Sequence, residues 1–156
     1  MPDLVTHTAA AYFLTRPRFF QRFRILFYLG TILPDILARP VHILFPELYL
    51  YSVAIHTPIF MFIVTLLFGE LVHPSIRKQA MLYLGAGIML HFFLDLFQKH
   101  LTAGYYWFFP FSWTSFEVGL FWPEAPVRLI PMWLLLVLGI ELVLRFLGKH
   151  KANPVY

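Results

Sequence analysis

Three long apolar segments constrain this chain more than any other feature. Residues 53–72, 79–97 and 129–147 are almost free of charged side chains, and each matches the roughly 20 residues that a helix needs to cross a bilayer. Of all residues, 60% are hydrophobic and 13% are charged, against about 25% charged in soluble globular proteins. Because so few charges could not cover the surface of a soluble fold, we predict an integral membrane protein.

Two shorter apolar segments precede these three. Residues 3–15 and 25–38 are each shorter than a full crossing, and Gly30 and Pro34 interrupt the second. We interpret both as short or broken membrane helices. No repeat or linker divides the chain. We therefore expect one domain, residues 1–156, with an all-α fold: a polytopic membrane helix bundle of about five short or broken membrane helices.

The basic residues predict an orientation, since Lys and Arg are retained on the cytoplasmic side of a membrane. If five segments alternate in direction, three clusters that hold nine of the twelve basic residues fall on one face. We therefore expect a multi-pass protein of the cell (inner) membrane with a cytoplasmic C-terminus. The sequence leaves the oligomeric state open. The clusters are Arg16, Arg18, Arg22 and Arg24; Arg77 and Lys78; and Arg145, Lys149 and Lys151.

The first basic cluster, RPRFFQRFR at residues 16–24, also has the composition of some nucleic-acid-binding segments. Its place between two apolar segments favours a cytoplasmic loop instead. We expect membrane lipid, and no nucleic acid, as a partner.

Residues 104–122 are rich in Trp, Tyr and Phe and fall on the outer side of the predicted bundle. Such side chains favour the headgroup level of a membrane. The segment is therefore interpreted as an interfacial belt, with a lid over a pocket or a re-entrant loop as the alternative.

Seven ionisable residues lie within the apolar segments, where they are costly and mark functional sites. Five of them fall towards the outer face, and Glu70 and Glu141 fall near basic residues at the inner face. The five outer residues are His7, Asp35, His56, His91 and Asp95.

The spacing of His91 and Asp95 suits a metal site. Residues four apart lie on one side of a helix, so an imidazole nitrogen and a carboxylate oxygen can reach one ion. Three imidazoles and two carboxylates suit zinc, manganese or iron. The alternative for each residue is a hydrogen bond that ties helices together. Among the other histidines, we expect His100 to lie outside the ligand set, and His42, His73 and His150 to lie in loops and at helix ends.

An ordered series of short motifs resembles the membrane-bound metal-dependent hydrolases, a family distantly similar to zinc-dependent phospholipase C. The series covers residues 5–112 and consists of Thr6–His7, G-x-x-x-P-D at Gly30–Asp35, H-T-P at His56–Pro58, H-x-x-L-D at His91–Asp95, and Gly104 followed by P-F-S ending at Ser112. The resemblance implies a metal site formed by His7, Asp35, His56, His91 and Asp95. Relatives with a fuller site have a second His soon after the one that matches His56, where this chain has Ile59–Phe60–Met61.

The expected activity is hydrolysis of a phosphoester of a lipid or lipid-linked substrate. The expected cofactor is a divalent metal ion, with zinc as the first choice, because a bound metal lowers the pKa of water. Asp35 and Asp95 are the expected catalytic carboxylates, each a ligand or a general base. The rival hypothesis is a small transporter or scaffold that uses the same cluster to handle ions or protons. A serine hydrolase is disfavoured because no G-x-S-x-G segment occurs.

Overall fold

The computed structural model describes residues 4–100, 105–122 and 124–152, and these residues confirm the all-helical prediction. The six α-helices are α1 (Leu4–Leu14), α2 (Arg24–Leu44), α3 (Tyr49–Ile55), α4 (Pro58–Leu71), α5 (Pro74–Leu96) and α6 (Ala125–Ala152), with 3-10 turns at Arg18–Phe23 and Pro46–Leu48.

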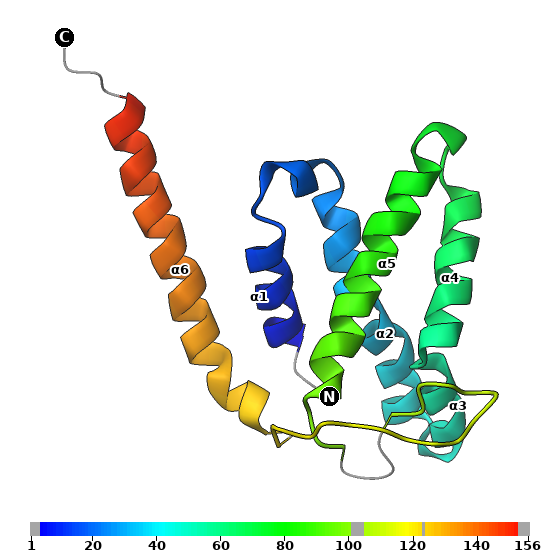
Figure 1. The fold of residues 1–156 in the computed structure, drawn as a ribbon. Coiled ribbons are helices and arrows are strands. Elements are labelled where there is room, and N and C mark those ends of the chain that lie inside the picture. Colours follow the sequence, from blue (N-terminus) through cyan, green and yellow to red (C-terminus); the bar gives the residue numbers. More distant parts are fainter. Residues whose placement is uncertain (1–3, 101–104, 123, 153–156) are drawn as a thin grey trace.

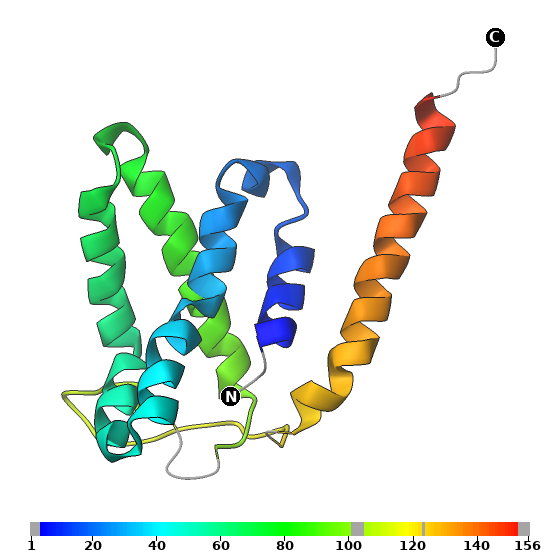
Figure 2. The same ribbon diagram turned by 180° about the vertical axis from the view of Figure 1, so that it is seen from behind.

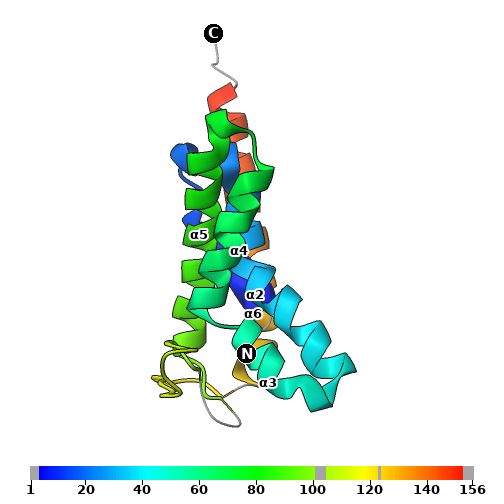
Figure 3. The ribbon, with the colours of Figure 1, turned by 90° about the vertical axis from the view of Figure 1, so that its right-hand side faces the viewer.

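The long helices run alternately up and down (Figures 1 and 2). The α1–α2 connection, the α4–α5 connection and the C-terminal end of α6 lie at one end of the molecule, so the three basic clusters share an end. The loop that follows α5 crosses the opposite end. In side view the second half of α2 and α3 splay away from the bundle at that same end (Figure 3).

The predicted five crossings are resolved only in part. Among the described residues, two helical stretches, Pro74–Leu96 and Val127–Leu147, are long and apolar enough to cross a membrane, and a bent pair, Pro46–Ile55 with Pro58–Leu71, could form a third span. Helix α1 has 11 residues, which reach only about 16 Å. Helix α2 has 21 residues but carries Asp35 and Arg39 within it.

The predicted segment 53–72 breaks where the sequence reads His56–Thr57–Pro58. Helices α3 and α4 meet there at a bend of 69°. Thr57 caps α4 by accepting a hydrogen bond from the backbone N–H of Phe60, and Pro58 fills the first turn, where its missing N–H costs nothing. The break leaves His56 at the C-terminal cap of α3, so a turn rather than a helix face positions its side chain.

Helix α6 packs mainly against α1 and stands apart from the other helices (Figure 1). The most apolar window of its Val127–Leu147 stretch has a mean hydropathy of 2.2, and none of that window is buried inside the protein, as expected for a helix that faces lipid. One polar contact ties it to the bundle: Arg16 pairs with Glu141 at 2.5 Å, and Tyr12 donates a hydrogen bond to the same carboxylate. At the same end Arg77 pairs with Glu70 at 3.3 Å, so both glutamates pair with basic residues, as predicted.

Two glycines let α2 and α5 cross closely. A Cβ added at Gly30 would lie 2.1 Å from the backbone oxygen of Leu84, and one added at Gly87 would lie 2.1 Å from the backbone oxygen of Phe27. Small residues at such positions let helix backbones approach in a membrane. Beside this crossing lies the apolar core of Met61, Leu84, Ile88 and Phe92.

We predict that Gly87→Ala destabilises the protein by about 2–3 kcal/mol, because the added methyl group meets backbone that cannot move aside. Gly85→Ala is the matched control two residues away. Its Cβ would meet only the Thr65 side chain, at 4.0 Å, and alanine favours helix over glycine. Thermal unfolding in detergent measures both; equal stability of the two variants would contradict the close crossing.

Candidate metal centre

Four elements contribute the five predicted residues to one buried cluster. His7 lies on α1, Asp35 on α2, His56 at the α3–α4 turn, and His91 and Asp95 on α5. His56 is 6% exposed and the other four are fully buried. The structure therefore brings together the whole set that the sequence predicted, at the end of the bundle opposite the basic clusters.

Three possible ligand atoms lie close to the separations found in a tetrahedral zinc site. His56 Nε2 and His91 Nε2 are 2.9 Å apart, and Asp95 Oδ2 lies 3.4 Å and 3.3 Å from them. Ligands at 2.0–2.1 Å from zinc in tetrahedral geometry are about 3.3 Å from one another. One ion could therefore contact all three atoms with small adjustments.

Asp35 and His7 complete the cluster from the other side. Asp35 Oδ1 lies 3.7 Å from His56 Nε2, and His7 Nε2 lies 3.5 Å from Asp95 Oδ1. His7, Asp35 and His91 form a second possible ligand group. The His7 ring also stacks on the His91 ring, with centroids 4.2 Å apart. His91 is thus shared by both groups.

A backbone carbonyl fixes the orientation of His91. Its Nδ1 lies 2.8 Å from the backbone oxygen of Thr31 on α2. A carbonyl oxygen only accepts, so Nδ1 carries the proton and the Nε2 lone pair faces the cluster. This is the outer-shell contact that metal-binding histidines usually make. The close α2–α5 crossing supplies it.

The ion-pair partners of Asp95 are imidazoles. His7 Nε2, His56 Nε2 and His91 Nε2 lie 3.5, 3.4 and 3.3 Å from its carboxylate oxygens, and the side chain is fully buried. A cation bound among these atoms would further stabilise the buried carboxylate. Asp35 differs because Arg39 Nη2 lies 2.6 Å from its Oδ2. The two residues are four apart on α2 and so share one face of the helix.

The aromatic loop packs in part against the cluster. Tyr105 is 6% exposed and its ring lies 5.8 Å from the His56 ring; the Trp107 ring lies 5.8 Å from that of Phe92. Other large side chains of the loop, Phe111 and Trp113 among them, are exposed. The belt and the lid both stay predictions. Gly104, the first residue of its motif, lies outside the described residues.

Two further polar residues, Tyr105 and Gln98, were not predicted from the sequence. The Tyr105 hydroxyl and both side-chain amide atoms of Gln98 are buried and have no hydrogen-bond partner among the described residues. Gln98 follows His91 by seven and Asp95 by three, which is the same helix face, and the backbone stays helical through Phe97. This spacing in the sequence could have identified Gln98 as a candidate site residue. Burial raises the pKa of Tyr105, so its hydroxyl remains a donor.

The other histidines lie outside the cluster. The His100 backbone N–H donates to Glu117 at 2.8 Å, and its ring contacts Tyr105. His42 lies near the end of α2 and is exposed, and His73 caps α5. His150 lies near the end of α6, and its side chain is outside the described part of the chain.

Comparison of the chain with protein-family models, with curated proteins and with solved structures gives no match. The geometry of the cluster therefore carries the functional argument.

Proposed function

We propose that the chain is a membrane-bound, metal-dependent hydrolase that cleaves a phosphoester of a lipid or lipid-linked substrate. The observation that carries this proposal is the buried convergence of His56, His91 and Asp95, whose ligand atoms lie within 3.4 Å of one another. Zinc is the proposed metal, with manganese and iron as alternatives, since nitrogen and oxygen ligands suit all three. The motif resemblance to membrane-bound metal-dependent hydrolases agrees with this reading.

Each residue of the cluster has a proposed role in this reaction. His56, His91 and Asp95 would hold the metal, which when bound supplies a Lewis acid that lowers the pKa of water. Asp35 is the proposed general base, because its Oδ1 faces the cluster while Arg39 holds its Oδ2. Arg39 also supplies positive charge for a phosphate. Tyr105 and Gln98 offer further donors for phosphoryl oxygens.

A small pocket supports the assignment of a lipid substrate. Its volume is about 280 Å³, it reaches Asp35 and Arg39, and its other lining residues, from α1 and α2, are apolar. No polar atom of these residues faces the pocket, so it offers room for hydrocarbon next to the ion pair between the buried Asp35 and Arg39.

The transporter alternative receives less support. A proton or ion path needs polar groups through the whole bundle, but Met61, Leu84 and Ile88 fill the interior between the cluster and the basic end. Glu70 at that end has a side chain that is 71% exposed and paired with Arg77. The cluster is therefore one-sided among the described residues.

We further propose five crossings, with the cluster towards the extracytoplasmic face of the inner membrane. The chain has no cysteine, so single-cysteine variants report unambiguously. We predict that a membrane-impermeant maleimide labels Ser115→Cys in intact spheroplasts, because that loop crosses the end opposite the basic clusters. Ser75→Cys, in the first turn of α5 next to the α4–α5 connection, should label only after permeabilisation. The reverse pattern, or labelling of both, would refute the orientation.

The Asp95→Asn variant tests the chemistry, since it keeps the shape of the side chain and removes its charge. We expect metal occupancy and phosphoester hydrolysis to fall together by about 100-fold, on the scale of lost metal-site interactions. Glu70→Gln is the control and should retain both. Hydrolysis that survives a chelator, or full metal content in Asp95→Asn, would contradict the proposal.

A further inference from the structure

An apolar groove lies between α4 and α5, on the outer surface of the bundle. Its volume is about 610 Å³. Of its thirteen lining residues only Thr65 and Lys78 are polar, and the Thr65 hydroxyl is already bonded to the Met61 carbonyl at 2.8 Å. Apart from Lys78, the wall therefore offers a bound molecule only apolar contacts.

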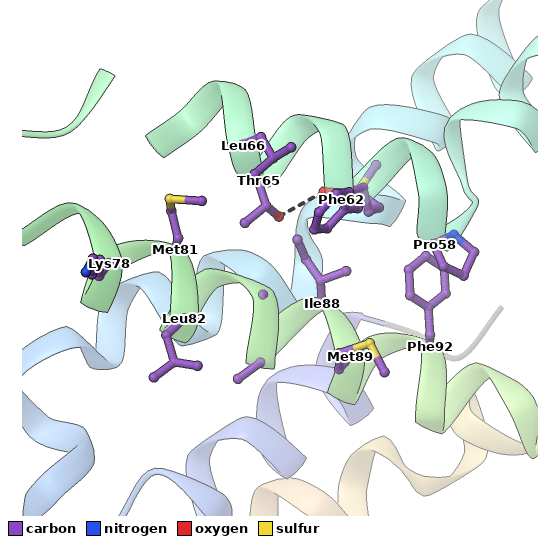
Figure 4. A pocket seen from close by; sticks show the side chains of 13 residues that line it. Pro58, Phe62, Thr65, Leu66, Lys78, Met81, Leu82, Ile88, Met89 and Phe92 are labelled. Carbon is purple, nitrogen blue, oxygen red and sulfur yellow. Dashed lines mark hydrogen bonds between the residues drawn. The ribbon is translucent and has the colours of Figure 1, made fainter. Parts of the chain in front are cut away.

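The groove has two distinct ends. Figure 4 shows Lys78 at one end and Pro58 with Phe92 at the other. The Phe92 ring lies 5.5 Å from the His56 ring and 5.6 Å from the His91 ring. One end of the groove thus shares a wall with the metal cluster. His56, the one member of the cluster that is not fully buried, lies next to that wall.

An apolar residue and a cationic residue both border the cluster. The Phe92 ring lies against the His56 ring; His56 Nε2 is 3.7 Å from Asp35 Oδ1, and Asp35 Oδ2 is 2.6 Å from Arg39 Nη2. The parts of a lipid phosphate follow a matching order, with the hydrocarbon chain first, then the ester and then the anionic phosphate. This order would place the ester at the metal.

The length of the groove restricts the hydrocarbon. Its lining on α5 extends from Lys78 to Phe92, which is about 21 Å at the helical rise of 1.5 Å per residue. One leaflet contributes about 15 Å, half of the hydrocarbon core. A chain that fills the groove must therefore pass the bilayer midplane.

We propose that this groove binds the chain of a polyprenyl phosphate, a single-chain isoprenoid lipid longer than one leaflet. Resting on the proposed hydrolase function, this identifies the substrate class as polyprenyl phosphoesters. Met81 and Met89 suit a methyl-branched chain, because methionine side chains adapt to irregular surfaces.

Gly85 allows the groove to be blocked without disturbing the fold. It lines the groove about halfway along α5, and an added Cβ would meet only Thr65, at 4.0 Å. Gly85→Leu therefore projects a side chain into the groove and leaves the half nearest Phe92 open. Gly139→Leu on α6, where an added Cβ meets nothing within 4 Å, is the matched control.

Binding is measured on the chelator-treated full chain in detergent, where no turnover occurs, by competition with a fluorescent long-chain polyprenyl phosphate. Wild type and Gly139→Leu should prefer the long chain to geranyl phosphate. Gly85→Leu should lose about tenfold in affinity for the long chain, since buried methylenes are removed from the groove, and should bind geranyl phosphate unchanged.

Three outcomes would overturn the groove assignment: an undiminished long-chain preference in Gly85→Leu, equal losses for both chain lengths, or equal competition by diacyl phosphatidic acid. The last would identify a general lipid contact. Because binding is measured separately from turnover, the two proposals can fail independently. Selective binding of the long chain with no hydrolysis would contradict the hydrolase and leave the groove assignment intact. Hydrolysis at the same rate for long and short chains would contradict the groove assignment and leave the hydrolase intact.

Discussion

The close crossing of α2 and α5 is the constraint on which the rest of the structure depends. Gly30 and Gly87 remove the side chains that would separate the two backbones. The approach places the Thr31 carbonyl against His91 and the Asp35 carboxylate beside the α3–α4 turn. Without it, His91 would lose the carbonyl that orients its ring, and Asp35 would lie farther from the cluster.

Burying this cluster in a membrane protein carries a free-energy cost that the described side chains offset only in part. Arg39 compensates Asp35, and Thr31 orients His91. The ion pairs of Asp95 are with the imidazoles of His7, His56 and His91, and the side-chain amide of Gln98 is buried without a hydrogen-bond partner among the described residues. Unpaired polar groups of this kind persist where function requires them. A divalent cation with a phosphorylated ligand would satisfy the carboxylate and the donors together.

Much of the site could be predicted because ionisable residues are rare in apolar segments. Each of five such residues could therefore be identified by itself: His7, Asp35, His56, His91 and Asp95. The break at His56 was visible as a cap followed by proline, but its 69° bend was not, since packing against α2 and α5 sets that angle. The number of crossings was harder to predict. Hydropathy alone does not identify a span in a helix such as α2, which carries Asp35 and Arg39 within it. Tyr105 and Gln98 were missed because their roles depend on how the loop after α5 folds back.

The central claim is that one divalent metal ion binds at His56, His91 and Asp95. X-ray absorption of the purified chain tests it most directly, with His91→Ala and the exposed His42→Ala compared. The account predicts about one zinc per chain, with nitrogen and oxygen ligands at about 2.0–2.1 Å and imidazole scattering. Occupancy should be lost in His91→Ala and kept in His42→Ala. Metal without imidazole ligands, or equal metal content in the two variants, would contradict it.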